Sequence, residues 1–549
     1  MNVSKNSVAS SLEGDSNKNN NGKRPLEPTS TLAAKRTQLD AYISASRALE
    51  SKESTGLNIL TIDALVVLET SAFKNFQLTS FRQLCQAFGA ICHMGDEEKK
   101  TEFKFQIKNA EVYNALMNVM LFKTHEGFAF HLKDALLKKM RFSQKSNVGA
   151  TMNRNIVNYK HSAKWSKLRP LICSFVINYI YMMENHSDEN VLLCALKCLS
   201  QYIPFLVSLQ SLKRKVLRCL LKIWSNNKNE NIVILAFIRI RQLATTSEQS
   251  FTENIMKNLY LSYVRNSKFS GFGDVQKISI MRRCVIELYK LDLKSAYQCA
   301  FVYIRQLGVH VRNALKDKSK DSWNQVYNSQ YLNSLRLWVT MIAYSKTEEL
   351  RPLCFPLVQI VLSSIRLSSS ACFFPFRLHC VELLVLLESS YDITIPVIPL
   401  LLELLDDSNI HSNKNHIASL KLPDLESLVK ATPAQTRSRQ FKDMILIKAF
   451  EILESHFALY KTFSAFPEMS YVPICSLKKL QRKLRTPRWR QMVKALIFRL
   501  EKWSLGAKSL RYAQFNIDKS IRCGSGLTQI KCDQKTKTEK QFELFINQD

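Results

Sequence analysis

Glycine is scarce in this sequence, and that scarcity excludes several kinds of binding site. Only 13 of the 549 residues are glycine, about a third of the usual frequency. Loops that cradle phosphates need glycine because their backbone approaches the ligand closely and often adopts a positive φ. Gly271 and Gly273 lack the third glycine of a dinucleotide-binding fingerprint, and no Walker-type loop occurs. The same scarcity disfavours turn-rich β-structure and favours long helices with short connections.

Motifs for metal binding and catalysis are also lacking. The 14 cysteines form no Cys-x-x-Cys pair, and the 10 histidines form no His-x-x-x-His set. His379 and Cys380 are adjacent, so they would point to different faces of a helix and do not easily form a nucleophile and base pair. We therefore predict no catalytic residue, no metal site, no cofactor and no small-molecule substrate. The protein is not expected to be an enzyme.

Long hydrophobic runs are absent as well. We find no apolar run of the roughly 18–20 residues that span a bilayer, and the best stretch, Ile395 to Leu402, is short and holds two prolines. The first 30 residues are polar and rich in asparagine, unlike a signal peptide. Many unpaired cysteines are typical of a reducing compartment. We expect a nuclear or cytosolic protein without a membrane partner.

Positive charge is abundant. Lysine and arginine number 78 against 46 aspartates and glutamates, a formal net charge of +32. Such an excess indicates a polyanionic partner, with nucleic acid as the first candidate and an anionic membrane surface as the second. The alternative is a lysine-rich surface without a specific partner.

The densest basic cluster lies near the C-terminal end of the sequence. It comprises Lys478, Lys479, Arg482, Lys483, Arg485, Arg488 and Arg490, with Trp489 among them. Cations neutralise phosphates, and an aromatic ring can stack on an unpaired base. We therefore predict RNA contact by these eight residues. The alternative is a helix that packs its leucines inward while its cations are simply solvated.

Composition divides the chain into five parts. Residues 1–55 are predicted to be a disordered basic tail, because large apolar side chains are few there. Two basic pairs in this tail resemble a bipartite nuclear localisation signal: Lys23, Arg24, Lys35 and Arg36. The expected parts that follow are a helical-repeat region (56–405), a polar loop (406–440), a basic C-terminal helical part (441–503) and a flexible tail (504–549).

Apolar residues recur at helical spacing through the middle of the chain. Leu192, Leu196, Leu199 and Ile203 form one such stripe, which Pro204 is expected to end. Prolines punctuate the apolar runs elsewhere, and only Phe103 to Ile107 reads like a strand. We predict an all-α fold, an elongated α-solenoid of degenerate helix pairs of the HEAT or armadillo kind with disordered termini. The alternative is two compact helical domains joined near residues 405–440.

A series of short motifs in the middle of the chain carries a family resemblance. In order they are Tyr303–Leu307, His310–Ala314, Val326–Tyr331, Phe355–Gln359, Phe374–Cys380 and Ile395–Leu400. This series resembles the nucleolar complex protein 2 family of factors that assemble the large ribosomal subunit. The resemblance covers roughly residues 160 to 515. The prolines and aromatics of the motifs are interpreted as joints and packing layers, and Arg377, His379 and Cys380 as structural.

The resemblance implies a location and a role. Family members are nuclear, mainly nucleolar and also nucleoplasmic, and act without catalysis in maturation and export of the pre-60S particle. The implied partners are nucleolar complex proteins 1 and 3, in heterodimers, together with the pre-ribosomal particle and its rRNA. Some members are also linked to histones and transcriptional repression. The alternative function is a nuclear helical-repeat adaptor, either a histone-binding co-regulator or a transport receptor.

The sequence departs from the family pattern in two respects. Ser329 stands where we expect tryptophan, so one packing or partner anchor is in doubt. The long acidic tails that are common in the family do not occur in this sequence, and we expect any role of such tails to be lost or taken by a partner. A specialised paralogue is therefore an alternative to a general factor.

Overall fold

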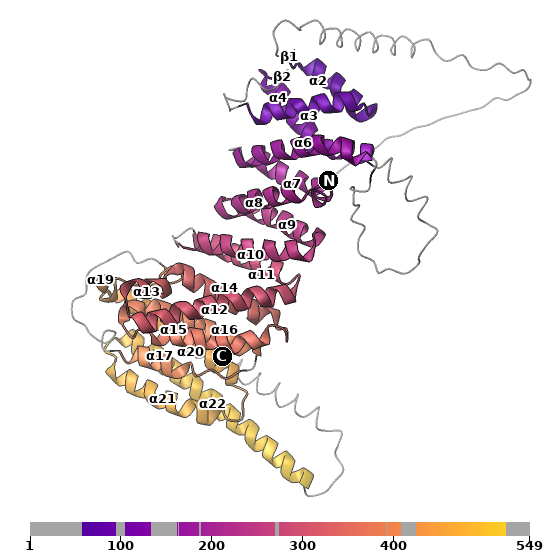
Figure 1. Cartoon of the computed structure of the whole chain (residues 1–549). Coiled ribbons are helices and arrows are strands. Elements are labelled where there is room, and N and C mark those ends of the chain that lie inside the picture. Colours follow the sequence, from indigo (N-terminus) through magenta and orange to yellow (C-terminus); the bar gives the residue numbers. More distant parts are fainter. Residues whose placement is uncertain are drawn as a thin grey trace, which may run out of the picture. The chain divides into compact units, whose positions relative to one another are not determined.

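The described part of the chain is almost entirely helical. The structure is a computed structural model, and it describes residues 58–94, 105–132, 162, 164–185, 188–268, 274–391, 393–407 and 424–522. Figure 1 shows the helices and strands with their labels. Contacts divide the chain into two compact units, and α6 (Trp165–Asn185) contributes Leu168–Asn178 to the first unit. The predicted all-α fold class is confirmed.

The first unit is small and contains one pair of very short strands. Its elements are β1 (Asn58–Ile59), α2 (Ile62–Glu69), the π-helical turn η1 (Thr70–Lys74), α3 (Leu78–Cys92), β2 (Phe105–Gln106), α4 (Ala110–Phe122) and a helical segment at 124–132. Strands β1 and β2 pair in parallel, with Asn58 opposite Phe105. The predicted strand at Phe103 to Ile107 is thus present at Phe105–Gln106. Phe81, Phe88, Phe128 and Phe175 fill the core of this unit.

The second unit contains most of the helices. Its elements are α7 (Glu189–Val207), α8 (Gln210–Asn226), α9 (Glu230–Thr246), α10 (Gln249–Asn266), α11 (Asp274–Tyr289), α12 (Leu293–Asp317), α13 (Lys320–Val326), α14 (Ser329–Ser345), η4 (Arg351–Leu353), α15 (Cys354–Arg366), η5 (Ala371–Phe373), α16 (Phe374–Tyr391), α17 (Ile398–Leu405), α19 (Pro433–Thr436), α20 (Arg439–Tyr460), α21 (Phe466–Lys483) and α22 (Pro487–Arg522). Extensive packing joins α7 and α8 to α9, α10 to α11, α14 to α16, α16 to α20 and α21 to α22.

Several of the prolines that punctuate the apolar runs mark helix starts. Pro352 and Pro399 lie at the first or second position of η4 and α17, and Pro375 is the second residue of α16. Proline costs little there because its missing N–H would have no partner inside the helix. Three prolines of the described residues lie inside helices, and one of them is Pro473 of α21. Pro170 lies inside α6, and Pro204 lies inside α7, which continues to Val207. The prediction that Pro204 ends the helix was wrong by three residues.

Helix α7 also corrects the expectation about hydrophobic runs. Its 19 residues are long and apolar enough, by length and composition alone, to cross a membrane. Half of its most apolar window is buried within the protein, and the helix packs on α8 and α9. This is the packing of a core helix.

The motifs that carry the resemblance form packing layers. The rings of Tyr327 and Phe373 stack with their centroids 4.0 Å apart, and Phe376 meets Tyr327 edge-on at 5.0 Å. The Tyr331 hydroxyl lies 3.0 Å from the Ser364 Oγ. Ser329 is the half-buried first residue of α14, directly after the N-cap Asn328. These aromatics join α13, α14, α15 and α16 through burial and polar tips.

The end of the described chain is more helical than expected. Helix α22 continues to Arg522, whereas we expected a flexible tail from residue 504. Trp503 and Ala507 are buried and extend the apolar stripe of this helix. Within the expected polar loop, the described part contains the short helix α19 and the start of α20.

Candidate functional site

The predicted RNA-contacting cations are exposed on α21, at the start of α22 and in the connection between them. We call Lys478, Lys479, Arg482, Lys483, Arg485, Arg488 and Arg490 the basic surface, and all seven are exposed. The two helices bury Leu477, Leu480, Val493, Leu496 and Leu500. Because apolar residues recur every three or four positions on each helix, the intervening cations face solvent.

Three members of the basic surface have partners. The Lys478 Nζ lies 2.8 Å from a Glu501 carboxylate oxygen, and hydrogen bonding to this carboxylate raises the pKa of Lys478. Lys483 pairs with Asp406. The Arg490 guanidinium donates to the main-chain oxygen of Arg485 at 3.0 Å. These contacts hold part of the surface in place without covering it.

The other four cations are the most available for a ligand. Among the described residues, no ion pair involves the side chains of Lys479, Arg482, Arg485 or Arg488. Exposed cations without a carboxylate neighbour keep their full attraction for phosphate. Lys479, Arg482, Arg485 and Arg488 are therefore the strongest candidates within the basic surface.

Trp489 is buried and is not placed to stack on a base. Its side chain is 7% exposed, and its Nε1–H donates to an Asp443 carboxylate oxygen of α20. The indole is thus packed between helices and does not face solvent in this structure. The seven cations are exposed, as both the RNA-contact prediction and its alternative require, while Trp489 is buried like a core residue.

The four basic residues of the predicted localisation signal, Lys23, Arg24, Lys35 and Arg36, lie outside the described residues.

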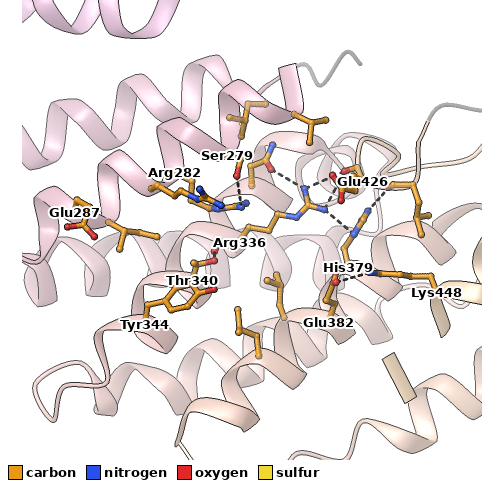
Figure 2. Close-up of a pocket in the computed structure, with 18 of the residues that line it drawn as sticks. Ser279, Arg282, Glu287, Arg336, Thr340, Tyr344, His379, Glu382, Glu426 and Lys448 are labelled. Carbon is orange, nitrogen blue, oxygen red and sulfur yellow. Dashed lines mark hydrogen bonds and ion pairs between the residues drawn. The ribbon is translucent and has the colours of Figure 1, made fainter. Parts of the chain in front are cut away.

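A second site, which the sequence did not indicate, lies in the middle of the second unit. A groove of about 890 Å³ is lined by residues of α11, α14, α16, α20 and the segment at 425–426. Figure 2 shows residues that line it. We call it the arginine groove after Arg282 of α11 and Arg336 of α14. The only hint in the sequence is that Arg336 is the one charged residue between Leu332 and Ala343, and this alone does not show which helices it meets.

His379 holds Arg336 within the groove. The Nε2–H of His379 donates to the main-chain oxygen of Leu425 at 2.8 Å, so Nδ1 is left to accept from the Arg336 guanidinium at 3.0 Å. Burial, reinforced by the Arg336 charge, lowers the pKa of His379 to about 3. The imidazole is therefore neutral at physiological pH. Arg336 also donates to the main-chain oxygen of Glu426 at 3.4 Å, which fixes the segment after the undescribed residues 408–423.

The motif residues next to His379 are buried, which is consistent with the packing role that we expect for them. Arg377 is 3% exposed and lies 3.3 Å from a Glu403 carboxylate oxygen. Cys380 is fully buried, and burial raises the pKa of its thiol far above the usual range. A buried neutral thiol is a poor nucleophile. Within the described residues, no group of three or more His, Cys, Asp or Glu side chains is placed to hold a metal ion.

Comparison with known proteins decides the family. The model of the Noc2p family matches residues 250–538, which is more than half of the chain and includes both the arginine groove and the basic surface. The chain belongs to the Noc2p family. The resemblance inferred from the short motifs is thereby confirmed.

Individual relatives agree with this assignment. The chain is 29% identical to nucleolar complex protein 2 of Drosophila melanogaster, over 78% of this chain and 54% of that protein. It is 28% identical to nucleolar complex-associated protein 2 of Arabidopsis thaliana, over 77% of this chain and 54% of that protein. An uncharacterised NOC2 family protein of Schizosaccharomyces pombe is 26% identical, over 82% of this chain and 63% of that protein.

Two consequences follow from these relatives. The matches span between about half and just under two thirds of the curated relatives' length. The relatives from Drosophila and Arabidopsis are named for a nucleolar complex and not for a catalytic activity, and these names support the predicted nuclear and nucleolar location.

Proposed function

We propose that this Noc2p-family protein is a non-catalytic scaffold in the nucleolar assembly of the large ribosomal subunit. The observation that carries the proposal is family membership, and the nucleolar names of its relatives support it. The proposed role extends to maturation and nuclear export of the pre-60S particle. The proposed partners are nucleolar complex proteins 1 and 3, in heterodimers with this chain.

The basic surface supports direct contact with precursor rRNA. Lys479 and Arg482 are exposed on α21, Arg485 in the connection to α22, and Arg488 at the start of α22, so four cations close together in the chain are open to phosphates. The net charge of +32 favours the same partner. Trp489 is not part of the proposed contact, because its ring is buried.

We also propose that the helix pairs of the second unit stack on one another to form an α-solenoid of the HEAT or armadillo kind. The support is the packing of sequential neighbours, such as α8 on α9 and α10 on α11. Electron microscopy of the protein in its native complex tests this: a curved ribbon of stacked helix pairs is expected, and a compact globule overturns the proposal.

Purification from nuclear extract tests the function. The tagged chain should recover nucleolar complex protein 1 or 3 together with large-subunit precursor RNA, in a particle of large-subunit size that ribonuclease breaks down. Recovery of neither protein nor precursor RNA overturns the proposal. Histones or transport cargo that remain bound after nuclease and high salt would instead support the adaptor alternative.

A further inference from the structure

The side chains that line the arginine groove carry more positive than negative charge. Five cationic side chains line it, Arg282, Arg283, Lys290, Arg336 and Lys448, against the carboxylates of Glu287, Glu382 and Glu426. Figure 2 shows Arg282 and Arg336 extending into the same space. A groove of about 890 Å³ has room for several side chains of a ligand.

The two central arginines have neutral partners. Arg336 donates to His379 Nδ1 at 3.0 Å and to Asn333 Oδ1 at 3.4 Å, and Arg282 donates to Ser279 Oγ at 3.3 Å. Within the described residues, no ion pair joins either arginine to a carboxylate. Burial lowers the pKa of Arg336, and the charge of Arg282 lowers it further. Two guanidiniums close to one another therefore lack a countercharge in contact with them.

None of the three carboxylates of the groove wall forms an ion pair with Arg282 or Arg336 among the described residues, although the charges of Glu382 and Glu426 partly oppose the lowering of the Arg336 pKa. Glu382 lies 2.8 Å from Lys448, and Glu287 lies 2.8 Å from Lys290. Each of these two carboxylates is already paired with a lysine, so neither neutralises an arginine by direct contact. An arginine fork binds a carboxylate with two parallel hydrogen bonds, which adds geometric specificity.

The rest of the lining favours a peptide over nucleic acid. Ile278, Ile286, Leu383 and Leu386 supply an apolar floor, and Tyr344 at the edge is 65% exposed. A phosphate backbone would approach three carboxylates here, whereas the basic surface of α21 and α22 offers clustered cations. The apolar floor would bind apolar side chains, and the two neighbouring arginines would bind a carboxylate. Together they are complementary to a segment in which acidic and apolar side chains alternate.

We propose that the arginine groove binds an acidic, leucine-rich segment of a partner protein, with one ligand carboxylate between Arg282 and Arg336. The ligand's apolar side chains pack on Ile286 and Leu386. The groove is ready for this ligand in the unbound protein, because His379 and the main chain at Glu426 already hold Arg336. The proposal adds to the scaffold function a defined site for a protein partner.

Fluorescence anisotropy of a labelled peptide on the full chain tests the proposal. The probe is a short synthetic peptide of alternating leucine and glutamate, and its counterpart has every glutamate replaced by glutamine. Arg282→Gln should weaken binding of the acidic probe by at least about tenfold, the value of one charged hydrogen bond. Lys277→Gln removes the same charge from the same helix outside the groove lining and should leave affinity unchanged.

A second variant is expected to tighten binding, a result that damage to the fold would not produce. Glu382→Gln removes a carboxylate from the groove and leaves Lys448 available, so it should tighten binding of the acidic probe several-fold. Equal binding of both peptides, or full affinity in Arg282→Gln, overturns the proposal. Loss of RNA affinity in Arg282→Gln, with RNA displacing the peptide, also overturns it and assigns the groove to nucleic acid.

The outcome can be separated from the scaffold proposal. Arg282→Gln in the tagged chain should still recover precursor RNA through the basic surface, and should lose only the protein that occupies the groove. A chain that binds the acidic peptide yet recovers no pre-ribosomal material would leave the groove intact and overturn the scaffold role.

Discussion

The basic surface and the arginine groove use the same residue types in different environments. On α21 and α22, leucines face inward and lysines and arginines face water. In the groove, Arg336 is half-buried, and neutral oxygen and nitrogen acceptors hold it in one position. Solvated cations attract any polyanion and are screened by salt, whereas fixed, partly desolvated cations select ligand geometry. The two proposed sites would thus give one helical unit two kinds of recognition.

The largest expected effect concerns a buried cluster around Glu388 of α16, a helix that also contributes to the groove lining. Glu388 of α16 accepts from His456 Nδ1 at 2.7 Å, from the Ile395 N–H at 3.1 Å and from the Tyr460 hydroxyl. Glu388→Ala leaves these groups without their acceptor and should lower the free energy of unfolding by at least about 3 kcal/mol, since each buried unsatisfied group costs about 1–3 kcal/mol. Thermal melting and urea denaturation measure the loss.

Glu382→Ala on the same helix is the matched control. Its exposed carboxylate forms an ion pair with Lys448 at the surface. Loss of such a pair should cost at most about 1 kcal/mol. Equal melting temperatures for the two variants would contradict the importance of the buried cluster. Below its melting temperature, Glu388→Ala should still bind RNA, because the basic surface lies on other helices.

The next largest effect concerns RNA binding. Replacement of Lys479, Arg482, Arg485 and Arg488 by glutamine should weaken binding to single-stranded RNA by about a hundredfold at low salt, because about four phosphate contacts are lost. The slope of log affinity against log salt should fall by about 3, at about 0.7 per contact. Filter binding over a salt series measures both values.

A variant with the same loss of charge provides the control for this experiment. Lys257, Lys294, Lys316 and Lys320 are exposed on α10, α12 and α13, away from the basic surface. Their replacement by glutamine should change affinity by no more than a few-fold. If both quadruple variants lose affinity equally, RNA binds through net charge alone and the comparison between the two regions fails.

The exposure of much of the basic surface could be predicted from sequence periodicity, whereas the existence of the groove could not. Leu477, Leu480 and Leu484 mark the inward face of α21 by spacing alone, which places Lys479 and Arg482 outside. The same rule could have placed Trp489, since Trp489, Val493, Leu496 and Leu500 continue one stripe. The groove depends on contacts between residues 43 and 90 positions apart, from Arg336 to His379 and to Glu426. No local pattern specifies which helices meet.

Acid should destabilise the groove more than the basic surface. The pKa of His379 is about 3 in the folded protein and about 6.5 when unfolded. Since the unfolded chain takes up this proton first, the contribution of His379 is complete above about pH 6.5 and is lost as pH falls toward 3. The free energy of unfolding should fall by up to about 1.4 kcal/mol per pH unit in that window.

His379→Gln isolates this contribution. Glutamine can still donate to Leu425 and accept from Arg336, but it does not titrate. The difference in unfolding free energy between the protein and His379→Gln should therefore change between pH 6 and pH 4, measured by urea denaturation. Parallel pH profiles for the two proteins would show that the imidazole is not held neutral by the groove.

The smallest effect tests the position of Trp489. If the indole is a packing residue, Trp489→Leu should lower the free energy of unfolding by about 1–3 kcal/mol, because a cavity forms and Asp443 loses its donor. RNA affinity should stay within about twofold. If the ring stacks on a base instead, the same change should weaken RNA binding by about 1–3 kcal/mol. Filter binding and thermal melting of one variant thus distinguish the two roles, and Trp489→Phe, which keeps a ring but loses the N–H, shows whether the bond to Asp443 contributes to stability.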